Sequence, residues 1–491
     1  MALPACQTGD LQLDRALRCA LGDVLGNIVP AQVGLLESPT PVLMAGLTYE
    51  AWTRDAAINS WNMLSALDPA TARSTLRGEV VRDGSAWRLR GQYWDAVVWV
   101  LGAWDHALWT GDREFLAFAR AVSADWLARM ERDEYDAELG LFRGPACFND
   151  GVAGYDDRYA RADGKSCILD WRLANPRDRH PVGEGMPMHA LSTNCLYQRA
   201  YAVLGAMDRL LGNGMDAHHA AMAERTAASI RRHFWKAEER RFRYIVDPWG
   251  ADERQEGLGH AFADLFGISP EPTVASLHQA DAGLPCLWPT YPRYAGLGGA
   301  RSSHGRHAGL IWPHVEGFAA EAAARGGAPA LAWSMLRRLA ARALRDGQFS
   351  ECYHPDDGLP DGGVQEIDPG DPADWHAWCL GPRVGSFDGI PLHAWLSQPR
   401  TTWGATALWR LVLRVLAGLD PRPDGLHVSP CLPDGSGALH LTGLRWHQAV
   451  IDLHIEPGRN HHLSIDGHAA TAVPCGASGH LTVIAHATKP A

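Results

Sequence analysis

Carboxylates beside tryptophan and glycine recur along this chain, and these residue types suit acid–base chemistry. Glu351 stands in FSECYHPDDG, residues 349–358, a turn-rich stretch between two helical patterns. Loops of this kind on a rigid scaffold often carry catalytic residues. A lone glutamate in a turn is usually structural, so any chemistry here depends on a second carboxylate elsewhere in the chain.

Two early clusters place charged residues among aromatic ones. In AWTRDAAINSW, residues 51–61, Arg54 and Asp55 lie between Trp52 and Trp61. They could form a surface ion pair at a helix start, or a polar clamp in an aromatic groove. Asp95 follows Trp94 at the start of an apolar helix, where helix capping and ligand contact are both compatible with its position.

A third cluster lies between Phe148 and Trp171, in a long stretch without helical period. Such a stretch is typical of a functional or a disordered loop. Its aromatic content argues against disorder. Asp170 follows Ile168-Leu169 and precedes Trp171, a partly apolar niche that raises a carboxyl pKa and suits a general acid. A capping aspartate is the alternative. The other members are Phe148, Asp150, Tyr155, Asp156 and Asp157.

A distant Asp and Glu, each in an aromatic loop, could flank a scissile glycosidic bond. Glycoside hydrolysis needs one carboxylic acid to protonate the leaving oxygen, and one carboxylate to activate water or attack the sugar. The 20 tryptophans, against 11 Phe and 11 Tyr, also favour a sugar groove. Indole rings bind amphipathic ligands through their faces and their N–H donor.

The overall composition argues against several other classes of protein. A net charge of −11 without a basic stripe argues against binding to nucleic acid or anionic membranes. The chain contains no run of ~18 apolar residues, so the sequence predicts no membrane span. The ten cysteines include no C-x-x-C pair, and the start MALPACQTGD has no signal-peptide pattern. These features favour a cytoplasmic protein and leave open a homo-oligomer.

The hydrophobic period predicts a mainly α-helical protein. Apolar residues spaced by three and four define helices over 196–211, 331–343 and 408–416, with Gly212 and Gly418 as stops. No stretch before residue 420 shows sustained strand alternation, whereas short alternating runs follow it. We expect a toroid of helical hairpins over residues 1–420 and a small antiparallel β-sandwich-like cap over residues 421–491.

Metal and cofactor signals are weak. His304 and His307 have the spacing of one helical face, but no carboxylate or third histidine is evidently spaced with them. The glycine-rich stretches lack the order that phosphate loops and nucleotide folds require. We therefore expect no metal site and no cofactor.

An ordered set of motifs resembles the helical-toroid glycosidases, a clan that contains trehalases, processing α-glucosidases and mannosylglycerate hydrolases. The resemblance covers most of residues 40–435, and the order of the motifs carries it. The motifs are AWTRDAAINSW, QYWDAVVWV, LDW before LSTNCLY, IWPHVEGF, FSECYHPDDGLPDGGVQ, and TTWGATALWR before LHVSPCLP. The resemblance implies an (α/α)6 toroid.

The resemblance also implies roles for individual residues. It makes Asp170 the general acid and Glu351 the base, with Asp156 or Asp157 as rival acids because the usual Gly-Trp-Asp pattern is altered. His354 stands where the clan often has Asp or Asn. The residues expected to hold sugar are Trp52, Arg54, Asp55, Trp94, Asp95, Asp150, Trp171, Trp312, Tyr353, Gln365 and Trp403.

The function implied is that of an inverting, exo-acting glycoside hydrolase that cleaves a terminal, α-linked sugar from a small glycoside. Related toroids house other chemistries, so a glycoside phosphorylase and a sugar epimerase are the alternatives. A phosphorylase requires a basic phosphate pocket, for which His304, Arg301 and Arg306 are the candidates.

Overall fold

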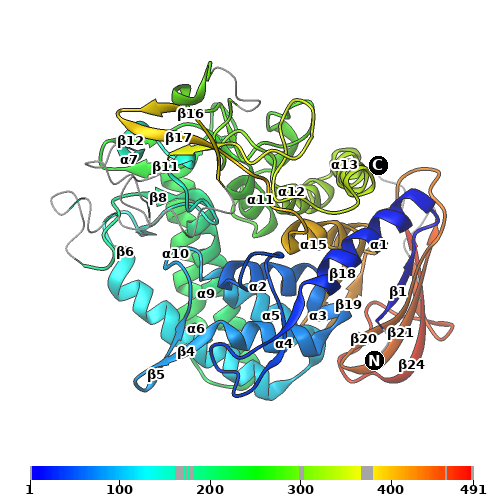
Figure 1. Cartoon of the computed structure of the whole chain (residues 1–491). Helices are drawn as coiled ribbons and strands as arrows, with labels where there is room; N and C mark the ends of the chain where they lie inside the picture. Colours follow the sequence, from blue (N-terminus) through cyan, green and yellow to red (C-terminus); the bar gives the residue numbers. More distant parts are fainter. Residues whose placement is uncertain are drawn as a thin grey trace.

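The computed structural model describes residues 3–160, 168, 171, 175, 182–297, 303–366, 380–458 and 462–487. Helices fill most of the molecule, and a sheet containing β20, β21 and β24 lies at one side of them (Figure 1). Within these ranges, no helix combines the length and the apolar character that a membrane crossing requires.

In the described part of the chain, six helical segments contact one another in a closed cycle. Each contacts the next along the chain, and the last returns to the first. They are α2 (Thr53–Asn59, continued by π-helical η1, Ser60–Leu64), α5 (Val98–Thr110), α9 (Leu191–Leu211), α11 (Gly257–Leu265), α12 (Pro313–Arg325) and α15 (Thr402–Arg410, continued by π-helical η5, Leu411–Leu416). Their side chains are mostly buried, as in α5, where every residue from Val98 to Trp109 is buried.

A second set of helices packs outside this cycle. α1 contacts α15, α4 contacts α5, α6 and α10 contact α9, and α13 contacts α12. These helices bury only one face, as expected for amphipathic helices on a protein surface. They are α1 (Leu11–Gly26), α4 (Pro69–Gly78), α6 (Arg113–Glu134), α10 (Asp216–Phe234) and α13 (Pro329–Asp346).

Short elements connect the helices. The short helices are α3 (Ser65–Leu67), α7 (Asp157–Ala160), η2 (Val152–Gly154), η3 (Val274–Ser276) and η4 (Pro292–Tyr294). The paired strands are β2 (Ile28–Ala31) with β3 (Thr40–Leu43), β4 (Val80–Asp83) with β5 (Ala86–Leu89), β6 (Tyr135–Asp136) with β7 (Leu141–Phe142), β9 (Trp235–Lys236) with β10 (Arg241–Phe242), β13 (Gln255–Glu256) with β14 (Leu287–Trp288), and β18 (Leu419–Arg422) with β19 (Gly425–Val428). Two three-stranded sheets join β8 (His189–Ala190), β11 (Ile245–Asp247) and β12 (Gly250–Asp252), and β15 (Val364–Glu366), β16 (Leu380–Phe387) and β17 (Ile390–Trp395).

The predicted helices are confirmed, with two refinements. The helix predicted over 196–211 begins earlier, at Leu191, because its first turn is the polar segment Ser192-Thr193-Asn194 and shows no apolar period. The helix predicted over 408–416 is α-helical only to Arg410 and then π-helical. Gly418 ends it with φ +62°, and a Cβ there would lie 1.9 Å from the carbonyl oxygen of Ser429, so a side chain has no room.

The structure contains strands before residue 420, where the sequence shows no sustained alternation. β16 and β17 form a hairpin of eight and six residues in the second half of the helical region. No residue of β16 is fully buried, so its sequence, LGPRVGSF, carries no alternation of apolar and polar residues. A strand without a buried face gives no period of two.

The C-terminal sheet is not purely antiparallel. Among the described strands its order is β1-β20-β21-β24-β22-β23, and β21 pairs with β24 in parallel. β1, from the N-terminal stretch, pairs with β20, so the sheet contains residues from both ends of the chain (Figure 1). The strands are β1 (Ala5–Gln7), β20 (Leu439–Trp446), β21 (Gln448–Pro457), β22 (His462–Ile465), β23 (His468–Ala469) and β24 (Ser478–Ala487).

The close approach of α2 and α5 gives a test of the helix cycle. A Cβ on Gly102 of α5 would lie 2.7 Å from the carbonyl oxygen and 2.8 Å from the Cα of Ala57 in α2. We expect Gly102→Ala to lower the free energy of unfolding by about 1–3 kcal/mol, because the two backbones must separate. Urea unfolding measures the change.

Gly22 of α1 is the matched control, because a Cβ there meets nothing within 4 Å. Gly22→Ala should raise the free energy of unfolding by roughly 0.5–1 kcal/mol through helix propensity alone. Equal effects at the two positions would contradict the packing of α2 against α5.

Candidate active site

The N-terminal ends of the cyclic helices meet at one place. Arg54, in the first turn of α2, reaches Asp95 just before α5 and lies 5.6 Å from the Trp403 ring at the start of α15. His314, at the start of α12, stacks on Trp403 with ring centroids 4.1 Å apart. Ser192, at the start of α9, donates its backbone N–H to Glu256 just before α11. Side chains from separate hairpins therefore gather at this end.

Arg54 is the centre of a buried polar network. Its Nη1 donates to Asp95 Oδ2 at 2.7 Å and to Gln92 Oε1 at 2.9 Å. Its Nη2 lies 3.4 Å from Asp150 Oδ2, and Gln92 Nε2 donates to the same oxygen at 3.0 Å. The Arg54 side chain is only 8% exposed, so these partners replace the water that the charge has lost.

Glu351 occupies a second, adjacent network. Its Oε1 accepts a hydrogen bond from the Tyr49 hydroxyl at 2.9 Å, and its Oε2 accepts one from Arg306 Nη2 at 2.5 Å. Its own backbone N–H donates to the carbonyl of Gln398 at 2.8 Å. The side chain is 4% exposed, so both carboxylate oxygens are fixed in direction.

Burial and neighbouring charges shift the pKa values of this cluster. Burial raises the pKa of Asp55 to about 8, with Arg54 opposing the shift and the negative charges of Glu351 and Asp95 adding to it. Burial lowers the pKa of His307 to about 3, although Asp150 opposes this. At neutral pH these shifts favour the protonated form of Asp55 and the neutral imidazole of His307.

Asp150 is the most accessible carboxylate of the Arg54 network, with a side chain 29% exposed. Burial raises its pKa, but Arg54, His307 and the bond from Gln92 outweigh burial and leave the pKa lowered. His307 Nε2 lies 3.4 Å from Asp150 Oδ1. Asp150 is therefore a carboxylate at neutral pH.

The loop before Asp150 is held in a strained conformation. Phe148 has φ +58°, which is unfavourable for a residue with a bulky side chain. The loop is secured by the Cys147 N–H, which donates to Ser192 Oγ at 2.9 Å, and by the Ala146 N–H, which donates to the Tyr155 hydroxyl at 3.0 Å. Strain of this kind persists only where surrounding structure imposes it, and it clusters at functional sites.

Aromatic rings surround these networks. Trp312 stacks with His307 and contacts Trp403 edge-on, with centroids 5.1 and 5.4 Å apart. Trp52 has φ +43°, is 38% exposed, and lies 4.5 Å from the ring of Tyr49, the residue that binds Glu351. An exposed ring held at this point offers a platform for a sugar face.

Most of the predicted sugar-binding residues meet in this place. Arg54, Asp55, Asp95 and Asp150 share one network, and Gln365 Oε1 lies 3.3 Å from His307 Nδ1. Trp94, Trp171 and Tyr353 do not line the networks. Trp94 and Trp171 belong to a hydrophobic cluster, and the Tyr353 hydroxyl accepts the backbone N–H of Ser350. These three aromatic residues were predicted as ligand contacts, and their contact with a sugar stays a prediction.

The predicted acids have separate outcomes. Asp170 lies outside the described residues. Asp156 is 46% exposed beside Arg158, and Asp157 pairs with Arg293 at 3.2 Å. These pairings tie Asp156 and Asp157 to arginines other than Arg54 and Arg306, so their placement gives no support to either as the acid.

Sequence reasoning did not single out Tyr49, Gln92 or His307 as parts of the site, and it considered Arg306 only for phosphate binding. Arg306 follows a glycine-rich stretch that has no recognisable motif, and Gln92 precedes the aromatic pair Tyr93-Trp94. The hydrogen-bond partners of these residues lie far along the chain, from 38 positions for Gln92 with Arg54 to 302 positions for Tyr49 with Glu351. No local spacing could therefore have identified them. Tyr49 alone carried a signal, as an aromatic residue close to Trp52.

The raised pKa of Asp55 predicts a pH effect on stability. A carboxyl whose pKa is raised on folding costs stability as the pH increases from its ordinary value near 4 to about 8, because the unfolded chain ionises first. Asn cannot ionise. The melting temperature of Asp55→Asn should therefore match that of the wild type near pH 4.5 and exceed it by about 2 °C or more at pH 8.

The exposed Asp83 supplies the control for the charge change. Asp83→Asn should shift the melting temperature equally at both pH values. A gap between Asp55→Asn and the wild type that stays constant with pH would contradict the protonated state of Asp55.

Three solved structures share the fold at low sequence identity. A GH63 mannosylglycerate hydrolase from Thermus thermophilus, solved with Tris and D-glycerate, is 14% identical with a TM-score of 0.59, and the alignment covers 81% of this chain and 100% of that one. A chain described as a sialidase is 14% identical with a TM-score of 0.61, and 98% of this chain matches 40% of it. A GH78 rhamnosidase of Bacillus sp. GL1 is 15% identical with a TM-score of 0.53, and 99% of this chain matches 44% of it.

This chain therefore spans less than half of the sialidase and rhamnosidase chains. No curated protein matches it. A family model for the mannosylglycerate hydrolase MGH1-like glycoside hydrolase domain matches residues 37–366. Because this match spans well over half of the 491 residues, the predicted clan is confirmed, and the chain belongs to the MGH1-like glycoside hydrolase family.

Proposed function

We propose that this chain is an inverting, exo-acting glycoside hydrolase that removes a terminal, α-linked sugar from a small carbohydrate substrate. We also propose that residues 1–420 form an (α/α)6 toroid and that residues 421–491, with β1, form its β-cap. The closed cycle of six inner helices, with further helices outside it, supports this architecture. The joined N-terminal ends of the inner helices would then form the floor of the active site.

The observation that carries the proposal is the environment of Glu351. Each of its oxygens accepts one bond, from Tyr49 or from Arg306, and Asp55 and Asp150 lie in the neighbouring network. A carboxylate with both oxygens fixed is suited to orient a water and to take its proton. An inverting enzyme places this base about 6.5–9.5 Å from the acid, which leaves room for the water.

Asp150 is our candidate for the general acid among the described carboxylates. Its side chain is 29% exposed and that of Asp55 is 2% exposed, so Asp150 is the more accessible of the two to a leaving oxygen. A sugar that engages Arg54 and Gln92 would remove partners that hold Asp150 charged, and it would exclude water. Burial would then dominate and raise the pKa of Asp150, as a general acid requires. Asp170 remains the rival from the family resemblance.

Hydrolysis is preferred to phosphorolysis for a structural reason. Of the three residues considered for a phosphate pocket, Arg301 lies outside the described residues and Arg306 is paired with Glu351. His304 lies within 4.8 Å of a carboxylate oxygen of Asp356, which would repel phosphate. Among the described residues, no observation favours an epimerase over a hydrolase.

Glu351→Gln tests the base. Since Gln cannot accept the proton, kcat on the best substrate from a panel of disaccharides and glycosyl-glycerates should fall by about 10²–10⁴-fold. Glu321→Gln is the matched control. Glu321 lies in α12, the helix that begins at the site, and it is as buried as Glu351. It is also paired with an arginine, Arg410, at 2.5 Å. The control variant should lower the melting temperature and leave kcat within a few-fold. Near wild-type turnover by Glu351→Gln would remove Glu351 from the mechanism.

The two acid candidates are separated by leaving-group dependence. Asp150→Asn should abolish cleavage of substrates with poor leaving groups and spare aryl glycosides with activated ones, because these need little protonation. Asp170→Asn, measured on the same two kinds of substrate, should slow both kinds equally or not at all. If only Asp170→Asn shows the selective loss, the acid is Asp170 and Asp150 holds the sugar.

A further inference from the structure

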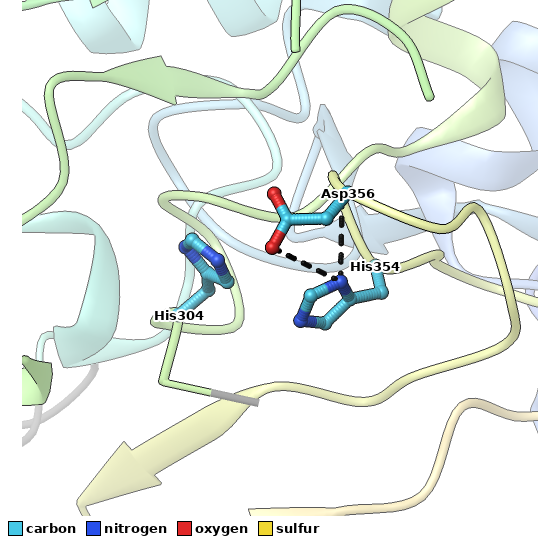
Figure 2. Close-up of side chains that lie close together, drawn as sticks. All are labelled: His304, His354 and Asp356. Carbon is cyan, nitrogen blue, oxygen red and sulfur yellow. Dashed lines mark hydrogen bonds and ion pairs between the residues drawn. The ribbon is translucent and has the colours of Figure 1, made fainter. Parts of the chain in front are cut away.

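Two histidines far apart in the sequence face each other beside the Glu351 network. The rings of His304 and His354 lie edge to face with centroids 5.2 Å apart, and the Asp356 carboxylate lies next to them (Figure 2). One nitrogen from each ring and one oxygen of Asp356 all lie within 4.8 Å of one another. His307, which the sequence paired with His304, contacts Asp150 instead.

Further carboxylates make the surroundings strongly negative. His354 Nδ1 lies 3.9 Å from both Asp356 Oδ2 and Asp357 Oδ1. The same nitrogen accepts the backbone N–H of Asp356 at 3.3 Å, and a metal bound at this nitrogen would replace that hydrogen bond. Asp361 also acts electrostatically on His304. Two imidazoles with several carboxylates are the ligand set that borderline dications such as Zn²⁺ prefer.

The spacing permits a metal after a small adjustment. Zn²⁺ binds nitrogen and oxygen at about 2.0–2.2 Å, so tetrahedral ligand atoms stand roughly 3.4 Å apart. The present atoms, which lie within 4.8 Å of one another, must therefore approach by up to about 1.4 Å. The Asp356 side chain is 72% exposed and stands on a turn, so it can make this movement at little cost.

We propose that His304, His354 and Asp356 form a binding site for a divalent transition metal, with Zn²⁺ as the preferred ion. The ion would join two segments that hold the Glu351 side chain. His304 is two residues before Arg306, and His354 is three residues after Glu351 itself. It would stabilise the folded state by tying these segments together, whatever reaction the chain performs.

The test uses the full chain after dialysis against EDTA. Titration with ZnCl₂, followed by calorimetry, should give one equivalent bound per chain and a higher melting temperature. His354→Asn, which places a residue type often found here in the clan, should weaken Zn²⁺ binding at least 10-fold. Asp356→Asn should weaken it by about the same factor, and its exposed position keeps folding intact if His354→Asn is unstable.

A second histidine pair provides the control. His440 and His454 face each other across β20 and β21 with Nδ1 atoms 2.7 Å apart, and they could also collect Zn²⁺. His440→Ala should leave the single equivalent unchanged. The proposal is overturned if the wild type binds no Zn²⁺, if both His354→Asn and Asp356→Asn bind it like the wild type, or if His440→Ala abolishes binding.

Discussion

The buried guanidinium of Arg54 is the interaction on which the site depends. A charge removed from water is tolerated only when paired and hydrogen-bonded, and Arg54 obtains its partners from separate parts of the chain. Asp95 and Gln92 come from the segment before α5, and Asp150 comes from the loop before α9. One side chain thus holds the start of α2 against two other hairpins, while Trp403 at the start of α15 lies beside it.

This constraint explains the two states of charge within the site. Arg54 pairs with Asp95 and Asp150 through its two terminal nitrogens. Its Nε lies 3.7 Å from Asp55 Oδ2, so Asp55 shares the charge of an arginine that already has two other partners. Burial and the charges of Asp95 and Glu351 then raise the pKa of Asp55 far above its ordinary value. Arg306 plays the corresponding part for Glu351. The result is a site that combines fixed carboxylate acceptors with neutral hydrogen-bonding groups such as Tyr49 and Gln92.

The sequence predicted the helical region, and it singled out several residues that the structure brings together, because both leave local signals. The periods at 196–211 and 331–343 marked real helices, and Arg54, Asp55 and Glu351 stood out by their aromatic neighbours. Pairings between distant segments left no such signal. Tyr49 with Glu351, His304 with His354, and the parallel pairing of β21 with β24 appear only once the chain is folded. For Trp94 the local sequence is the same whether the ring lines a groove or packs in a core, so its neighbours along the chain do not separate these two places.

The stereochemistry of the first product tests the central claim most directly. Proton NMR of the reaction mixture, recorded before mutarotation, identifies the anomer released from an α-linked substrate that the wild type cleaves. The account predicts the β-anomer first, because Glu351 would direct water to the face opposite the leaving group. The α-anomer as first product would contradict it, since retention requires a covalent intermediate and a carboxylate that acts as nucleophile.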